Sequence, residues 1–160
     1  MKLFLTFTIS LFLVSVSIAE NHLLAPEKII QNTTGKVLDR VKRDKEVLRE
    51  NPGEMFRLVS DLIFPHFDFS VMSRFVMGSE WKSLPEDKRN AFVDQFRKLL
   101  VRTYAAALLE FSDQEIDYVR SENKTGASTA KVFQEIKSKS GTPMIISYRL
   151  HNRNTDWMVF

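Results

Sequence analysis

The sequence of 160 residues contains no cysteine and only three histidines. Without a thiol the chain forms no disulfide and carries no lipid anchor on a cysteine. No cluster of cysteine, histidine and acidic residues has the spacing of metal ligands. The nucleophile elbow, the phosphate-binding glycine loops and the zinc motif H-E-x-x-H are also missing. We therefore expect no metal, no cofactor and no convincing catalytic centre.

An excess of either charge is also lacking, because 23 lysine and arginine residues are balanced by 20 acidic residues. This near balance argues against nucleic acid as a partner. The segment from Lys36 to Glu50 mixes both signs, which is typical of a solvated helix face. The alternative is a face that docks on anionic head groups or on an acidic protein surface, and salt would then weaken binding steeply.

The N-terminus has the order of a secretory signal peptide. A basic residue, Lys2, precedes an apolar run from Leu3 to Val14, and small residues then lead to Ala19. This order predicts cleavage before Glu20. The apolar run is shorter than the roughly 20 residues that span a bilayer, so cleavage is favoured over a membrane anchor. We expect export to the periplasm, with residues 1–19 as the signal peptide and residues 20–160 as a single domain.

Apolar residues at helical spacing predict four helices in the first two thirds of the chain. The first three are expected at residues 26–49, at residues 54–63, and from residue 68 or 70 to Gly78. The fourth is long and central and continues to Phe111. At its start, Ser83 and Glu86 are predicted to form a capping box around Pro85.

Beyond Asp113 the apolar period changes to two, which predicts strands. Four strands are expected, at residues 116–118, 130–136, 144–150 and 157–160, with turns before Gly141 and at residues 152–156. Helices followed by strands predict an α+β fold in which N-terminal helices pack on a curved antiparallel sheet. Because the fourth strand stops in mid-run at Phe160, the C-terminal part of the domain is expected to be truncated.

One pair of residues is a candidate for catalysis. His66 and Asp68 lie in an aromatic loop, where a turn would bring them together as a base and its orienting carboxylate. The simpler interpretation is that Asp68 caps the third helix and that His66 is a partly exposed loop residue. A small exported enzyme that uses His66 and Asp68 is kept as an alternative.

Phenylalanine and methionine are concentrated between residues 55 and 77. Such a stretch is usually core, although these side chains also adapt to irregular apolar ligands. Composition alone does not separate the two interpretations, so an exported adaptor with a filled core and no ligand stays open. The stretch contains Met55, Phe56, Phe64, Phe67, Phe69, Met72, Phe75 and Met77.

Several short patterns follow one another in a distinctive order. They are Pro65-x-Phe67-Asp68-Phe69 with Met72-Ser73, then Gly78 and Trp81, then Phe92-x-x-x-Phe96-x-x-Leu99-Leu100-x-x-Thr103-Tyr104, and finally Tyr148-Arg149-Leu150 with Trp157. No single tripeptide is specific, but the order and spacing together are hard to imitate. With them the chain resembles the MlaC-type periplasmic phospholipid-binding proteins, also described as toluene-tolerance auxiliary proteins, over nearly the whole expected mature chain.

This resemblance implies a carrier without enzyme activity. Such a carrier shuttles phospholipid between an outer-membrane lipoprotein complex and an inner-membrane ABC transporter, and so helps to maintain outer-membrane asymmetry. It also implies acyl chains between the helices and the sheet, a head group near solvent, and a chain that continues beyond the tryptophan strand.

We expect a monomer whose lipid-binding residues take inward positions of the helices and strands. These predicted residues are Phe69, Met72, Phe75, Phe96, Leu100, Tyr104, Leu108, Val132, Ile146 and Tyr148.

Overall fold

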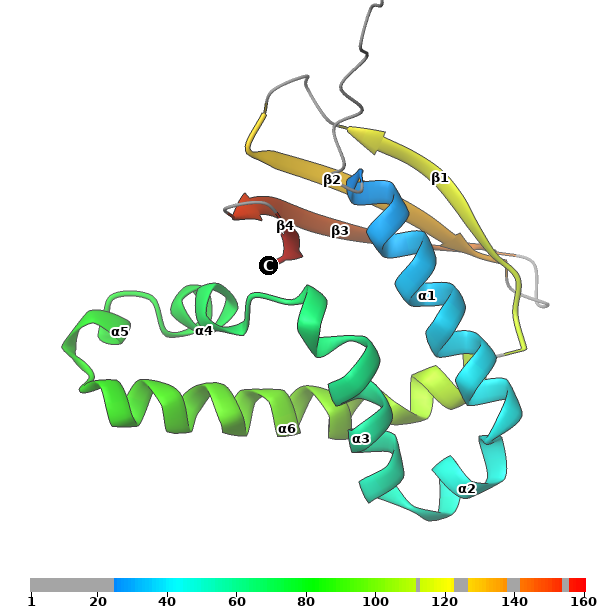
Figure 1. The fold of residues 1–160 in the computed structure, drawn as a ribbon, viewed down its shortest axis with the longest axis horizontal. Coiled ribbons are helices and arrows are strands. Elements are labelled where there is room, and N and C mark those ends of the chain that lie inside the picture. The colour runs from blue at the N-terminus through cyan, green and yellow to red at the C-terminus, as the bar shows by residue number, and fades with distance from the viewer. Residues whose placement is uncertain (1–24, 112, 123–126, 138–141, 154–155) are drawn as a thin grey trace, which may run out of the picture.

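The computed structural model describes residues 25–111, 113–122, 127–137, 142–153 and 156–160 (Figure 1). Helices occupy the N-terminal part of this region and strands the C-terminal part, which confirms the α+β prediction. The predicted signal peptide and the turn expected before Gly141 lie outside the described residues. The helices are α1 (Pro26–Arg43), α2 (Lys45–Glu50), α3 (Pro52–Leu62), the 3-10 turn η1 (Phe64–His66), α4 (Phe69–Met77), α5 (Glu80–Ser83) and α6 (Glu86–Phe111). The strands are β1 (Ile116–Glu122), β2 (Thr129–Ile136), β3 (Met144–Arg153) and β4 (Asp156–Val159).

The strands form one antiparallel sheet in the order β1-β2-β3-β4. Ala130 of β2 pairs with Leu150 of β3, and Leu150 pairs in turn with Val159 of β4. Directly opposite residues of paired strands point to the same face of the sheet, so these three residues share one face. That face is covered by α1, which lies across the sheet (Figure 1).

The segment before α4 extends the sheet beyond β4. Phe67 forms a parallel bridge with Val159, and the Asp68 N–H donates to the Val159 carbonyl oxygen at 2.8 Å. The chain therefore joins the helical part to the sheet here as well as through α1.

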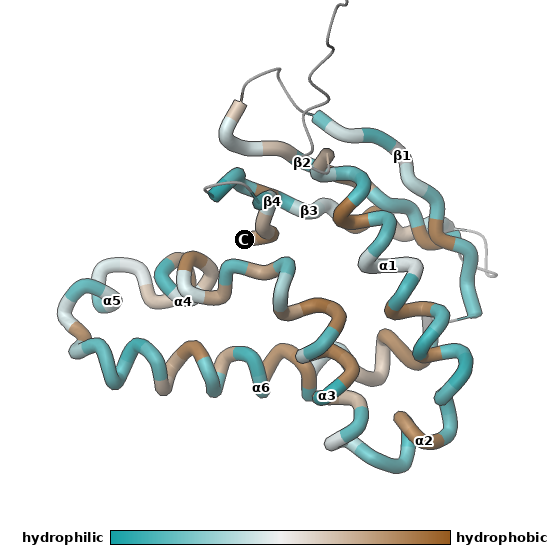
Figure 2. The backbone as a smooth tube through the Cα atoms, in the orientation of Figure 1, coloured by the Kyte–Doolittle hydropathy of each residue, from teal (hydrophilic) through white to brown (hydrophobic). Residues whose placement is uncertain are grey.

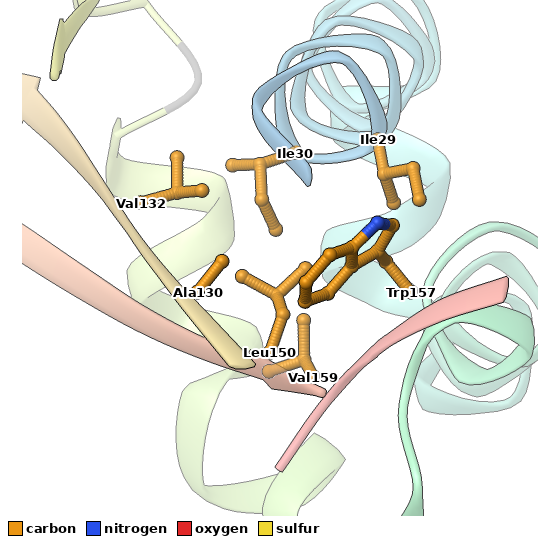
Figure 3. Close-up of a cluster of buried hydrophobic side chains, with 7 residues drawn as sticks. All are labelled: Ile29, Ile30, Ala130, Val132, Leu150, Trp157 and Val159. Atoms are coloured by element: carbon orange, nitrogen blue, oxygen red, sulfur yellow. The ribbon is translucent and has the colours of Figure 1, made fainter. Parts of the chain in front are cut away.

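A first hydrophobic core, called the sheet core below, fills the space between α1 and the sheet. Figure 3 shows its members from α1, β2, β3 and β4 pointing toward one another. Phe67 and Tyr148 pack against its border. Its buried residues are Ile29, Ile30, Ala130, Val132, Leu150, Trp157 and Val159.

A second core, called the helical core, lies among α1, α2, α3 and α6. Helix α1 belongs to both cores, because Ile29 and Ile30 near its start face the sheet while Val37 and Val41 face the other helices. Because one helix contributes buried side chains to both cores, it holds the two cores in a fixed position relative to each other. The buried residues of the helical core are Val37, Val41, Leu48, Met55, Leu58, Val59 and Val101.

The first helix is shorter than predicted. The helix expected over residues 26–49 breaks at Asp44, whose backbone has φ −111° and ψ 21°, and α2 follows in a new direction. Asp44 forms ion pairs with Arg40 and Arg43. The break lets Leu48 of α2 be buried in the helical core, and that burial is the physical reason for the turn.

The predicted capping box of the long helix is wrong. Gly78 ends α4 with φ 59°, and the chain then forms the extra short helix α5, which buries Trp81. Ser83 belongs to this helix and donates its hydroxyl to the Glu80 carbonyl oxygen at 2.7 Å. Helix α6 nevertheless begins at Glu86 and runs to Phe111, so its existence and its end are as predicted.

Hydrophobic and hydrophilic residues alternate along most of helix α6 (Figure 2). It packs on α1, α2, α3 and α4 and so connects the helical core to the α4 region. Among the helices that the structure describes, none is both long enough and apolar enough to cross a membrane.

Candidate functional site

The Asp68 carboxylate fixes the N-terminus of α4 to the sheet. As the N-cap of α4, it accepts a hydrogen bond from the Val71 N–H at 3.0 Å. Its Oδ2 accepts a second hydrogen bond from Arg153 Nη1 at 2.9 Å and lies 3.2 Å from His151 Nε2. The side chain is only 3% exposed, so the hydrogen bonds from Val71 and Arg153 stabilise a carboxylate that burial would otherwise penalise. The prediction that Asp68 caps this helix is confirmed.

His66 and Asp68 are not brought together as a base and its orienting carboxylate. The carboxylate faces β3 side chains, whereas His66 lies near Lys36 and Asp156. Burial and the Lys36 charge lower the pKa of His66, while the Asp156 charge opposes them. Within the described ranges, no three histidine, cysteine or acidic side chains are grouped to hold a metal. The arrangement needed for the enzyme alternative is therefore not formed.

Aromatic rings pack where η1, α4 and α6 meet. Phe69 lies edge-on to Phe64 with ring centroids 4.8 Å apart, and it stacks on Phe67 at 5.9 Å. Arg97 of α6 places its guanidinium 4.9 Å from the Phe69 ring centre and 5.7 Å from that of Phe64. Because Phe69 is buried, these contacts join α4 to α6 as part of the protein interior. Phe69 is thus packed against protein side chains, and its contact with a ligand stays a prediction.

A second aromatic group, at the surface, joins α4 to the end of β4. Phe75 is 63% exposed and stacks on Phe160, with ring centroids 5.9 Å apart. His151 of β3 meets the same Phe160 ring edge-on at 5.1 Å. The guanidinium of Arg149 lies 5.0 Å from the centre of the Phe160 ring. This contact brings together residues that are far apart in the sequence.

The apolar edge of α4 consists of Met72, Phe75 and Val76, and we call it the α4 edge. Positions separated by three and four residues lie on the same side of a helix. Met72 is half-buried, whereas Phe75 and Val76 (62% exposed) face solvent. Large apolar side chains grouped at a surface are typical of sites that bind a ligand or a partner.

The predicted residues of α6 vary in exposure along one side of the helix. Phe96 is half-buried and stacks on Phe92 at 6.1 Å, and Leu100 is also half-buried. Tyr104 is 58% exposed, while Leu108 packs against the helical core. The stripe is therefore enclosed at its C-terminal end and open at Tyr104.

The predicted residues of the sheet lie on the face toward α1. Val132 is completely buried in the sheet core and pairs in register with Tyr148, which packs against the same core. Burial raises the pKa of Tyr148, and a hydrogen bond with the Thr34 side chain partly opposes this. Thr34 also donates its hydroxyl to Gln134 Oε1 at 3.0 Å, so a polar network crosses the interface. The third residue, Ile146, is half-buried on the same face.

The described part of the chain has hollows at two places that bear on a ligand site. One, of about 640 Å³, lies among α4, α5 and α6 and has a mostly polar lining that includes Arg89 and Arg97. The other, of about 570 Å³, lies on the sheet and is lined by Glu122, Ala127, Thr129, Ala130, Lys131, Arg149, Leu150 and Phe160. Neither hollow is lined by any of the ten residues predicted to bind lipid. Contact between those ten residues and a ligand therefore stays a prediction.

A protein-family model described as MlaC protein matches residues 31–160. The chain belongs to the MlaC family. It is 26% identical over 161 residues to the intermembrane phospholipid transport system binding protein MlaC of Haemophilus influenzae, with 98% of this chain and 73% of that protein covered. It is 26% identical over 136 residues to the toluene tolerance protein ttg2D of Pseudomonas putida, with 84% of this chain and 62% of that protein covered.

A solved structure of a phospholipid-binding protein is similar along most of the chain. The phospholipid-binding protein of Ralstonia solanacearum, determined in complex with a phospholipid, superposes with a TM-score of 0.79. The two are 25% identical, and the match covers 86% of this chain and 76% of that one. The likeness confirms the predicted family resemblance and the arrangement of helices before an antiparallel sheet.

In this member of the MlaC family, three residues of the surface aromatic group were not predicted from the sequence. They are Phe160, which stacks on Phe75, and Arg149 and His151, which both contact the Phe160 ring. Arg149 and His151 flank the buried Leu150 in the sequence. This alternation indicates that both lie on the face of the sheet opposite to α1. Nothing in the local sequence indicates that α4 approaches that face.

Proposed function

We propose that this protein is a periplasmic phospholipid carrier that acts without catalysing a reaction. It shuttles lipid between an outer-membrane complex and an inner-membrane ABC-type complex, and so helps to maintain outer-membrane asymmetry. The observation that carries the proposal is the match of 86% of the chain, at a TM-score of 0.79, to a relative in complex with a phospholipid.

The exposed apolar residues of α4 and α6 support a role for this region in holding acyl chains. Phe75, Val76 and Tyr104 each expose more than half of their surface, although apolar residues of this size are normally buried. A long acyl chain laid against them would remove the same area from water. The α4 edge and the stripe of Phe96, Leu100 and Tyr104 are therefore our proposed lipid contacts.

The sheet residues have a different role in this proposal. Val132 and Tyr148 already pack against α1, and a lipid chain could reach them only by displacing side chains of the sheet core. We infer that they form the wall behind the site, whereas the contacts with acyl chains lie on α4 and α6.

The energetics of transfer explain why a carrier is needed. Each methylene transferred from water contributes about 0.8 kcal/mol, so two acyl chains with about 30 methylenes correspond to roughly 24 kcal/mol. Free diffusion through water is therefore very slow. Transfer from a bilayer to an apolar protein surface is close to neutral in free energy, because the environments are similar. The direction of transport is then set by the partner complexes.

The first test is native mass spectrometry of the natural full-length protein purified without detergent, followed by organic extraction and lipid analysis. The proposal predicts phospholipid bound in a stoichiometric amount. A preparation free of lipid, which also takes up none from vesicles, would contradict it and favour an adaptor without ligand.

A matched pair of variants tests where the lipid binds. Val76 on α4 and Val47 on α2 are exposed to 62% and 56%, so Val76→Glu and Val47→Glu place the same charge at similarly accessible positions. We expect Val76→Glu to lose most of the co-purified phospholipid and Val47→Glu to retain it, with similar circular dichroism spectra. Equal lipid content in both variants would remove the α4 edge from the site.

A further inference from the structure

The hollow on the sheet lies beside residues of β2 and β3. Lys131 and Arg149 line it, and each alternates with a residue that is buried in the sheet core, Ala130 and Leu150 respectively. Adjacent residues of a strand point to opposite faces, so both basic side chains project away from α1. Both are exposed, and the hollow beside them has a volume of about 570 Å³.

Two like charges face each other across this part of the sheet. Lys131 and Arg149 are direct partners in the register of β2 and β3. Among the residues that the structure describes, neither has a carboxylate within ion-pair distance. Glu122 pairs with Lys131 in the strand register, but its carboxylate lies 3.3 Å from Arg120. Like charges in directly opposite positions destabilise a sheet, and a bound anion would relieve this repulsion.

One of the two cations is connected to the α4 edge. The guanidinium of Arg149 lies over the Phe160 ring, and Phe75 stacks on the same ring. Cation–π contact holds the planar guanidinium in place while its N–H donors stay free for an anion. The surface therefore changes from cationic at Lys131 and Arg149 to apolar at Phe160 and Phe75, within one continuous group of side chains. A phospholipid has the same order of chemistry, because its phosphodiester adjoins its acyl chains.

We propose that Lys131 and Arg149 bind the phosphodiester group of the lipid whose acyl chains contact the α4 edge. This inference rests on the proposed carrier function and identifies the part of the lipid that this chain recognises. Arginine binds phosphate oxygens in a bidentate manner, and lysine adds a second point charge. Phosphatidylethanolamine and phosphatidylglycerol share this phosphodiester. The site therefore does not distinguish ethanolamine from glycerol head groups, but it binds diacylglycerol, which has no phosphate, less well.

The test compares lipids with identical acyl chains on the full-length protein. Phosphatidylethanolamine, phosphatidylglycerol and diacylglycerol are offered in equal amounts to delipidated protein, and bound lipid is counted by native mass spectrometry. We expect the unmodified protein to retain both phospholipids at least about tenfold better than diacylglycerol, because even one charge-assisted hydrogen bond has an effect of this size. The double variant Lys131→Gln with Arg149→Gln should lose this preference and still bind diacylglycerol.

A matched control removes the same charge elsewhere. Lys42 on α1 and Arg102 on α6 are exposed, so Lys42→Gln with Arg102→Gln should keep the preference for phospholipid. A preference that persists in the Lys131 and Arg149 variant would overturn this inference while leaving the carrier function intact. Binding of no lipid of any kind by the unmodified protein would overturn the carrier function and this inference together.

Inorganic phosphate separates a lipid head group from a free anion. Titration with phosphate alone should give weak binding, because the acyl chains contribute most of the affinity. Tight phosphate binding that needs Lys131 and Arg149, without any preference among the lipids, would overturn the assignment to a lipid.

Discussion

The sheet core and the α4 edge contain similar residue types but differ in what surrounds them. In the sheet core, Leu150 and Val132 are completely enclosed between α1 and the strands. At the α4 edge, Phe75 and Val76 remain more than half exposed, and Phe75 stacks on Phe160, which follows β4. The comparison shows that an aromatic and aliphatic composition does not by itself identify core. The exposed residues are those available to a ligand, while the enclosed ones maintain the scaffold.

The largest expected effect is loss of stability in the sheet core. Leu150→Ala should lower the free energy of unfolding by about 2–5 kcal/mol, because it leaves a cavity among enclosed side chains. Leu99→Ala on α6, where the side chain is 49% exposed, should change it by no more than about 0.5 kcal/mol. Urea unfolding followed by circular dichroism measures both. Similar losses in the two variants would remove the distinction between enclosed and exposed leucines.

The next largest effect is expected at Asp68, whose contacts join α4 to the sheet. Asp68→Asn keeps an N-cap side chain but removes the charge opposite Arg153, so we expect a loss of about 1–3 kcal/mol in stability. The control is Asp94→Asn, which removes an exposed ion pair with Arg97 at 3.4 Å and should cost about 0–1 kcal/mol. If the two variants unfold at the same urea concentration, the contacts of Asp68 with β3 do not stabilise the fold.

A smaller loss is expected from the polar network under the sheet. Tyr148→Phe removes the hydroxyl that shares a hydrogen bond with Thr34, which should lower stability by about 0.5–1.5 kcal/mol. Lipid content should not change, because Tyr148 is assigned to the wall behind the site. Loss of bound lipid in this variant, at unchanged stability, would instead make Tyr148 a direct lipid contact.

The smallest expected effect is the pH dependence that arises from His66. Its pKa is lowered in the folded protein, mainly by burial, from the ordinary value of 6.5. Protonation therefore favours the unfolded chain, and stability should fall as the pH drops below about 6.5. His66→Gln should reduce this slope between about pH 7.5 and 5.5. A slope that is unchanged in urea unfolding curves would show that other groups produce it.

Periodicity was sufficient to predict much of this fold. The change of apolar period beyond Asp113 predicts the strands, because it follows directly from alternation of side chains across a sheet. Asp68 was also predicted correctly as a cap, since a short acidic side chain before an apolar run has a local role. Local chemistry of this kind depends only on neighbours in the chain.

Features that depend on distant contacts were predicted less well. The break at Asp44 depends on the burial of Leu48 in the helical core. The position of Ser83 in α5 depends on the burial of Trp81. The contact between Phe75 and Phe160 needs the sheet register and the placement of α4, neither of which periodicity contains. The predicted site mixes enclosed and exposed residues for the same reason, because helical spacing gives the face of a helix but not what covers it.

The most direct test of the central claim is photo-crosslinking with a phospholipid that carries a diazirine in its acyl chain. The natural protein is loaded, irradiated and digested, and the labelled peptides are identified by mass spectrometry. We expect labels on α4, at Met72 to Val76, and on α6 around Tyr104. Labels confined to the α1 and β2 residues of the sheet core would contradict it.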